Sequence, residues 1–533
     1  MAFFSLHGYD ADVWIPQFLG LQQHDESLNT DVRYATEVLN VETPNGVLQP
    51  HSGYTLLPGQ FEGKKIETLA RFYRRWYDGS GSKYWLVCAV DGKLYYMQEG
   101  AVSWTEIPLL SSFDSNVWSW CTYERAVDGV DHPVDVLLMS NAEDGMIEVD
   151  PPEKPTTWGD VKTGYTWGTL KTKTWGQVRS EAWSIDTSIS TGGYKFGVIE
   201  RYAERIWGGA IKEYPDRLVY SAEYNPKDWT ENATYPEKGS GEIDQPSWDG
   251  DKFTALRSFG GQLIAFKGRR VWRVYGTNPG EYTFTEQYGG GAPFFNTICV
   301  DVERIIMADV DGLSVYDGMS VQPFARKLID PLWRKINKNA MDQMCAALFK
   351  NKYYLAVPMG TSTVNNALIV LNLEENTILY YDDMNIESLM ATENNIYATS
   401  STVPGVIYDL GYDSWVLEKA SGGATKWVSP WMDFGHKKVQ KGGFDMYICP
   451  EVKDDPVTLK ISIQTEKKTK TKEYTVNPLT AEQREAHKEH KFKKLHFGGT
   501  GRRFRVIIET ASGNTAPWRL IGGLQMVVET DPD

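Results

Sequence analysis

The residues best suited to hold a metal lie near the end of the chain: His487, Glu489, His490 and His496. His487 and His490 form an H-x-x-H pattern. Zinc proteases instead use H-E-x-x-H, which places two His ligands and a general base on one helix face. The spacing therefore favours a solvated polar segment, and we predict neither a bound metal nor a cofactor.

Three other segments could bind calcium or phosphate. Asp309 and Asp311 begin a stretch like a calcium loop, but the twelfth position, where an EF-hand needs a bidentate Glu, is Ser320. Gly59–Lys65 (GQFEGKK) lacks the spacing and the hydroxyl of a nucleotide-binding loop, and Gly289–Gly291 precedes Ala-Pro rather than a helix. All three segments are typical of turns.

Carboxylates that could serve glycoside hydrolysis are also present. Glu281, Glu286 and the pair Asp382-Asp383 lie at the ends of expected hairpins, where turns favour acidic residues. The sequence contains neither the G-x-S-x-G elbow of a serine hydrolase nor the Ser-x-Asp-x-Gly-x-x-Trp box of sialidases. We predict no catalytic residues and no enzyme activity.

Two segments have compositions that suit contacts with other molecules. Residues 150–200 are rich in Trp, Thr and Gly, and 467–494 are rich in Lys within a locally basic C-terminal part that includes Arg502, Arg503 and Arg505. Burial in the chain's own fold and simple solvation remain alternative interpretations. The predicted intermolecular contact residues are Trp158, Trp167, Trp175, Lys467, Lys468, Lys470, Lys472, Lys491, Lys493 and Lys494.

Overall composition narrows the function classes. The formal net charge of −15 argues against a general nucleic-acid binder, which needs a basic surface. The five Cys are scattered and odd in number, which is typical of reduced, buried residues in a cytosolic environment. Met1–Pro16 has no secretory pattern, and no stretch is apolar enough to span a bilayer, so we expect no membrane association.

Short strands closed by Gly or Asn turns recur through the first 420 residues. Asp-Gly between two alternating apolar runs is a strong hairpin signal, because a type I′ turn needs positive φ at both central residues. Repeats of roughly 40 to 50 residues built from hairpins favour propeller blades. The expected strands include 84–90, 94–97, 134–140, 146–149, 262–266, 271–275, 304–308, 313–316, 345–349, 353–357, 395–398 and 406–408.

These elements predict an all-β chain: a β-propeller of six or seven blades followed by an antiparallel β-sandwich-like domain. Residues 1–60 form an N-terminal segment that supplies a propeller-closing strand, with a short helix at Asp31–Asn40. The propeller occupies 61–420, interrupted at about 150–200, and contains helical spacing at Ala325–Met344. The sandwich occupies 421–533, with a solvated Lys-rich insert at 467–494 that is partly helical around Ala481–His490.

The order of several short motifs resembles the tail nozzle or hub proteins of short-tailed bacteriophages, also called packaged-DNA stabilisation proteins. The resemblance spans most of the chain. Residues 150–200 and 467–494 match nothing in that family. The motifs in chain order are Gly20-Leu21, Asn40-Val41, Gly46-x-Leu48-x-Pro50-x-x-Gly53, Val271-Trp272-Arg273-Val274-Tyr275-Gly276, Gly312-Leu313-Ser314-Val315-Tyr316-Asp317-Gly318, Trp431-x-Asp433-Phe434-Gly435 and Arg502-Arg503-Phe504-Arg505-Val506.

The resemblance implies a propeller protomer in a ring of six copies below the portal and the head-to-tail adaptor. Such a ring extends the DNA channel, retains packaged double-stranded DNA without reading its sequence, and guides its ejection. Tail fibres or spikes attach nearby, and the chain is assembled in the host cytoplasm into the virion tail. We further hypothesise that an acidic lumen repels phosphate during ejection.

Two other functions remain open from the sequence. One is a carbohydrate-binding or carbohydrate-cleaving propeller that acts as a receptor-binding tail protein. The other is a cytosolic scaffold, although no Gly-His…Trp-Asp repeat of the WD40 kind appears in the sequence.

Overall fold

The computed structural model describes most of the chain, in two compact units. The first comprises Met1–Leu57, Ala325–Thr402 and Ile407–Asp533, and the second comprises Pro58–Phe324 with Val403–Val406. The described residues are 4–7, 10–22, 30–57, 61–76, 81–101, 103–109, 111–125, 133–150, 183–246, 250–287, 289–410, 420–433, 440–480 and 492–531.

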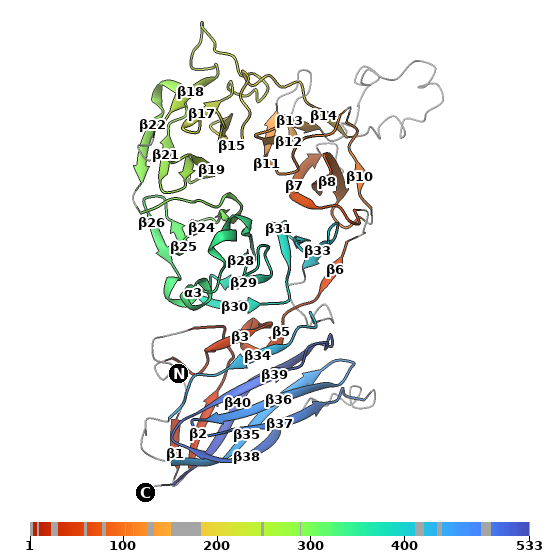
Figure 1. Ribbon diagram of the computed structural model, residues 1–533, viewed down its shortest axis with the longest axis vertical. Coiled ribbons are helices and arrows are strands. Elements are labelled where there is room, and N and C mark those ends of the chain that lie inside the picture. Colours follow the sequence, from red (N-terminus) through yellow and green to blue (C-terminus); the bar gives the residue numbers. More distant parts are fainter. Residues whose placement is uncertain are drawn as a thin grey trace, which may run out of the picture. The chain divides into compact units, whose positions relative to one another are not determined.

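The second unit consists of five consecutive four-stranded antiparallel sheets, each formed by strands adjacent in the sequence (Figure 1). The first sheet contains β7 (Ile66–Trp76), β8 (Gly81–Val90), β9 (Lys93–Gln98) and β10 (Thr105–Glu106). The second contains β11 (Ser119–Arg125), β12 (Val134–Asn141), β13 (Gly145–Asp150) and β14 (Ser184–Asp186). The third contains β15 (Val198–Tyr202), β16 (Arg205–Gly209), β17 (Arg217–Tyr220) and β18 (Gly241–Asp244). The fourth contains β19 (Phe253–Phe259), β20 (Gln262–Lys267), β21 (Val271–Tyr275) and β22 (Thr283–Gln287). The fifth contains β23 (Cys299–Val300), β24 (Ile305–Asp309), β25 (Gly312–Tyr316) and β26 (Val321–Phe324).

The hairpin turns test the Asp-Gly prediction directly. Asp91 and Gly92 have φ of 54° and 72° between β8 and β9, so the type I′ prediction is confirmed there. It is wrong at Asp311-Gly312, because Asp309 pairs with Gly312 and only Gly312 has a positive φ. The Asp311 backbone N–H instead donates to the Asp309 carboxylate at 2.6 Å, and this side-chain contact shapes the turn.

Apolar side chains from adjacent sheets pack together in the second unit. One buried cluster joins Cys121 and Tyr123 of β11 to Ile199 of β15, and another joins Trp207 of β16 to Leu263 of β20. The second, third and fourth sheets therefore each pack against two neighbouring sheets. Together, the described sheets make the chain all-β with many four-stranded antiparallel sheets, which fits the β-propeller-like class.

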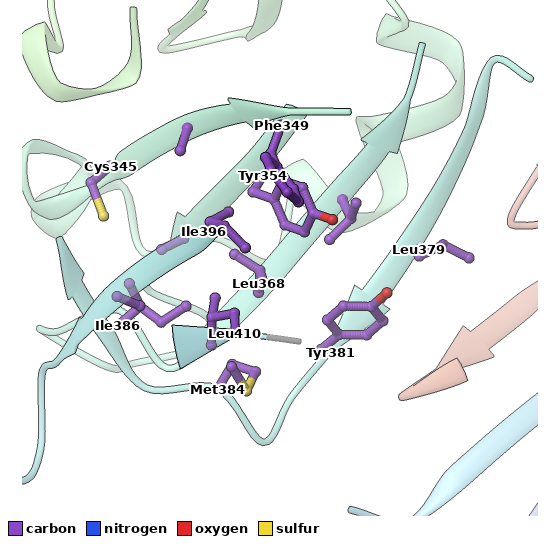
Figure 2. Close-up of a cluster of buried hydrophobic side chains, with 14 residues drawn as sticks. Cys345, Phe349, Tyr354, Leu368, Leu379, Tyr381, Met384, Ile386, Ile396 and Leu410 are labelled. Carbon is purple, nitrogen blue, oxygen red and sulfur yellow. The ribbon is translucent and has the colours of Figure 1, made fainter. Parts of the chain in front are cut away.

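The first unit contains two further four-stranded sheets. One contains β27 (Cys345–Phe349), β28 (Lys352–Val357), β29 (Ala367–Asn372) and β30 (Thr377–Tyr381). The other contains β31 (Ile386–Ala391), β32 (Ile396–Ser400) and β33 (Ile407–Leu410), completed by β6 (Tyr54–Leu56) from the N-terminal segment. Tyr408 pairs with Leu56 and Leu410 with Tyr54, which is the kind of pairing expected of an early strand that completes a late sheet. Figure 2 shows Tyr354, Leu368, Ile386 and Ile396 in the cluster that these two sheets bury between them.

Two five-stranded sheets form the rest of the first unit. One has the order β1 (Phe4–His7), β2 (Asp10–Ile15), β40 (Trp518–Asp531), β35 (Gln440–Val452) and β38 (Lys493–Gly501). The other has the order β3 (Glu37–Leu39), β34 (Thr425–Val428), β39 (Phe504–Thr510), β36 (Val457–Thr465) and β37 (Thr469–Val476). Phe444 of β35 packs against Phe504 of β39, with ring centroids 4.9 Å apart. β4 (Val41–Glu42) and β5 (Gln49–Pro50) form a separate small sheet.

The structure corrects three local predictions. Asp31–Asn40 forms turns and β3 rather than a helix, because β3 pairs with β34, a partner that is distant in sequence. The helical pattern at Ala325–Met344 gives an α-helix only at α3 (Arg326–Trp333), followed by a 3₁₀ segment, η6 (Lys338–Gln343). The insert 467–494 contains β37, which pairs with β36, and the beginning of β38; Ala481–His490 lies outside the described residues.

Three shorter 3₁₀ segments complete the described elements: η2 (Pro44–Gly46), η4 (Pro279–Glu281) and η5 (Phe295–Thr297). Among the residues that the structure describes, no helix has the length and apolar character needed to cross a membrane.

Candidate functional site

Of the residues first considered for chemistry, His487, Glu489 and His490 lie outside the described residues, whereas His496, Asp382 and Asp383 have partners in the structure. His496 Nδ1 lies 2.7 Å from Asp445 Oδ1 on β35. Asp382 accepts a hydrogen bond from the Asn40 amide at 2.8 Å, whereas Asp383 contacts His51. The Asp382-Asp383 pair is thus divided between two different partners. Within the described ranges, no three His, Cys, Asp or Glu side chains are grouped as a metal would require.

Lys470 and Lys472 occupy unexpected positions on the edge strand β37. Lys470 is paired with Ile463 and Lys472 with Ile461, and both isoleucines are buried. Because directly paired residues point to the same face of a sheet, the two lysines lie on its core-facing side. The ammonium group of Lys472 lies 5.7 Å from the ring centroid of Phe497. Inward-pointing charges on an edge strand prevent another strand from adding to the sheet. We therefore assign these two lysines a local role first.

Lys493 and Lys494 of β38 face opposite sides of their sheet. Lys493 is opposite the buried Ile448, whereas Lys494 is opposite Tyr447 on the other side. The Lys494 ammonium lies 2.8 Å from Asp445, which lowers the pKa of that carboxyl. Lys494 thus already has an acidic partner within the chain.

Lys467 and Lys468, the remaining described cations of the prediction, lie in the β36–β37 turn, next to the β38–β39 turn that contains Arg502 and Arg503. Glu466, in the β36–β37 turn, accepts the backbone N–H of Arg502 at 2.8 Å and of Arg503 at 3.2 Å from the β38–β39 turn. Both oxygens of this carboxylate are therefore engaged by the main chain. Lys467, Lys468, Arg502, Arg503, Arg505 and Trp431 are hereafter called the basic tip.

Two arginines of the basic tip share one aromatic ring. The guanidinium carbons of Arg503 and Arg505 lie 5.3 Å and 4.9 Å from the ring centroid of Trp431, and Arg505 Nε donates to the Gln464 amide oxygen at 2.8 Å. Arg over Trp is a favourable cation–π arrangement. Among the described residues, the ion pairs include none of the five tip cations. The tip therefore keeps an excess of positive charge beside a partly buried aromatic ring.

A second surface, not predicted from the sequence, lies on the loop between β17 and β18. In this loop, residues 221–240, the side chains of Tyr224 and Tyr235 are 60% and 55% exposed. Tyr224 has a φ of 58°, which is costly for a residue with a large side chain. Its backbone N–H donates to Glu204 at 2.9 Å, which holds it in this conformation. We call residues 221–240 the tyrosine loop.

One buried arginine holds the tyrosine loop in shape. Arg205, which is fully buried, donates from Nη1 to the carbonyl oxygens of Ser221 at 2.7 Å and Gly239 at 2.6 Å, and from Nη2 to that of Glu237. Trp229 in the middle of the loop is buried against Phe196. A loop tied at both ends and at its centre presents its exposed side chains with little entropy left to lose.

Charged residues on the first strands of neighbouring sheets form a row in the second unit. Arg75 of β7 lies 2.5 Å from Glu124 of β11 and 2.6 Å from the buried Asp135, and Arg201 of β15 lies 3.9 Å from Glu124. Burial raises the pKa of Glu200, also on β15, to about 7 despite the opposing influence of Arg257 and two backbone N–H groups. The ion pairs of Glu124 with Arg75 and Arg201 thus connect the second sheet to the first and to the third.

Charge is distributed unevenly along the sequence. Residues 421–533 contain 19 Lys and Arg against 14 Asp and Glu, whereas residues 1–420 contain 36 against 56. The tyrosine loop itself contains four acidic residues, Glu223, Asp228, Glu231 and Glu237. The predicted contact residues Trp158, Trp167, Trp175 and Lys491 lie outside the described residues.

Comparison with known proteins adds little to this geometry. No family model and no curated protein matches the chain. Among solved structures, the chain is similar to a dihydro-heme d1 dehydrogenase, NirN, at 7% identity and a TM-score of 0.33. The similarity covers 58% of this chain and 56% of that one.

Proposed function

We propose that this chain is a structural virion protein of a short-tailed bacteriophage, the tail nozzle. Six copies form a ring below the portal and adaptor, and the ring extends the channel through which double-stranded DNA leaves. In this proposal the seven four-stranded sheets of the described residues are seven propeller blades. The two five-stranded sheets are a β-sandwich domain, to which β1–β3 also contribute.

The observation that carries the proposal is that motif residues of the resemblance make long-range contacts within the first unit, and that the last two motifs meet in space. Asn40, from the early motif, has a φ of 52° and donates from its side chain to Ala424 at 2.9 Å, just beyond the predicted domain boundary. Trp431 and Arg503, from the last two motifs, stack on each other. Motif residues that define tertiary contacts are expected to recur together in proteins that share a fold.

The proposal depends on where the chain lies in the virus particle, and cryo-electron microscopy of particles tests this. We expect the purified chain to form six-fold rings, and an antibody against a C-terminal tag to label the tail end of intact particles. A particle whose tail lacks the chain would contradict the proposal. Particles depleted of the chain should lose packaged DNA.

A second candidate, a carbohydrate-binding receptor protein, is favoured by one observation. Exposed Tyr224 and Tyr235 on a rigid loop with four acidic residues resemble surfaces on which sugar rings stack. This candidate predicts that a monomer binds bacterial surface polysaccharide and that Tyr235→Ala weakens the binding. Stable six-fold rings without glycan affinity would exclude it.

A further inference from the structure

We infer that the tyrosine loop of one copy docks on the basic tip of a second copy. This inference rests on the proposed function only in that copies of the chain assemble with one another. The two surfaces are unlike, so the contact is head-to-tail, and each copy uses a different surface toward each neighbour.

Charge complementarity indicates that the partner of the basic tip is the tyrosine loop of a second copy. The basic tip has five cations, and both oxygens of the neighbouring Glu466 carboxylate already accept main-chain hydrogen bonds. The tyrosine loop has four acidic residues and two lysines, and one of these, Lys227, is 2.7 Å from Asp186 and 2.9 Å from Glu148. An acidic surface and a basic surface on the same chain attract each other between copies and steer their encounter.

The side chains at both surfaces are those that dominate binding energy at protein interfaces. Trp431, Arg503 and Arg505 lie at the tip, and Tyr224 and Tyr235 lie on the loop. Trp, Arg and Tyr are the residues most enriched among interface hot spots. A guanidinium can stack on an exposed Tyr ring while its N–H groups pair with a nearby carboxylate.

Preorganisation supports the assignment. Arg205 fixes both ends of the tyrosine loop, and Glu466 fixes the two turns of the tip to each other. Neither surface must order itself on contact, which reduces the entropic cost of association.

Charge reversal tests the contact. The tip variant combines Lys467→Glu, Lys468→Glu and Arg503→Glu, and the loop variant combines Glu231→Lys and Glu237→Lys; all five side chains are exposed. We expect each variant to lower the association constant measured by sedimentation at least about 100-fold. Lys460→Glu, an exposed charge reversal on the outer face of the same sheet as β37, is the control and should assemble like wild type.

A mixture of the two variants gives the sharper result. In the mixture, the acidic tyrosine loop of the tip variant meets the basic tip of the loop variant, and the reversed loop meets the reversed tip, so both contacts are complementary and native mass spectrometry should show mixed rings. A chain with both sets of substitutions should recover assembly. Rings that form normally in both variants would overturn this contact and leave the proposed nozzle intact. A chain that remains monomeric at all concentrations would overturn both.

Discussion

His51 Nε2 lies 2.8 Å from Asp383 Oδ1, and the imidazole also stacks on Tyr381 with ring centroids 4.2 Å apart. The two partners are 332 residues apart in sequence. His51 is buried and follows β5, whereas Asp383 follows β30, so the contact fastens the N-terminal segment to a late four-stranded sheet. A buried pair of this kind is costly to break on one side only.

The first prediction concerns acid stability. Burial opposes ionisation of Asp383, but the hydrogen bond and charge of His51 outweigh it and lower the pKa. A carboxyl with a lowered folded pKa contributes stability above its unfolded pKa, and this contribution is lost as pH falls through the folded value. Asp383→Asn should therefore destabilise the first unit by about 1 to 3 kcal/mol at pH 7 and by less at pH 3.

Chemical unfolding monitored at several pH values checks this expectation. Glu374→Gln, at an exposed carboxyl of the same unit, is the matched control and should follow the wild-type curve. An equal loss for Asp383→Asn at pH 3 and pH 7 would show that its ionised form does not stabilise the fold.

Glu200 should make stability depend on pH in the opposite direction from Asp383. Its pKa is raised to about 7, first by burial, so the folded state holds the proton more tightly than the unfolded state. Stability must then fall as pH rises from the unfolded pKa, about 4.3, through the folded value. Glu200→Gln should leave stability near pH 4 almost unchanged and increase it above pH 7. Thermal unfolding at pH 5 and pH 8, with exposed Glu281→Gln as control, measures the difference.

Local sequence patterns defined many of the strands well. β21 and β27 begin and end at the predicted residues, because alternation of apolar and polar side chains is a local property. The pairing of β3 with β34 and of β6 with β33 joins residues hundreds of positions apart, and no local pattern specifies such a partner.

Two features of the candidate site could not be predicted from the sequence, for physical reasons. The sequence of β37 is polar because lysines replace apolar residues at core-facing edge positions, which removes the usual alternation of apolar and polar side chains. The tyrosine loop reads as an ordinary polar loop, and its rigidity depends on Arg205. The sequence signal that could have drawn attention to the loop is an Arg at the start of an otherwise apolar strand, where the structure buries it.

Gly208 is predicted to be intolerant of a side chain. A Cβ at this position would lie 2.4 Å from the ring of Phe196, which is buried against Trp229 of the tyrosine loop. Gly208→Ala should cost about 1 to 3 kcal/mol through overpacking. Gly280→Ala is the control, because a Cβ there meets nothing within 4 Å. Similar melting temperatures for the two variants would show that Phe196 can move aside.

The inward lysines of β37 yield the last prediction. Lys470 and Lys472 lie at core-facing positions of an edge strand whose outer backbone groups can template another chain. The double variant Lys470→Val with Lys472→Val extends the apolar face to the edge, and we expect it to form concentration-dependent aggregates seen by light scattering. Lys470→Glu with Lys472→Glu retains charge at both positions and should remain as dispersed as wild type. Because neither residue belongs to the basic tip, this aggregation should be independent of the head-to-tail contact and should persist in the tip variant. A valine variant that stays dispersed would mean that the edge is protected by something other than these two charges.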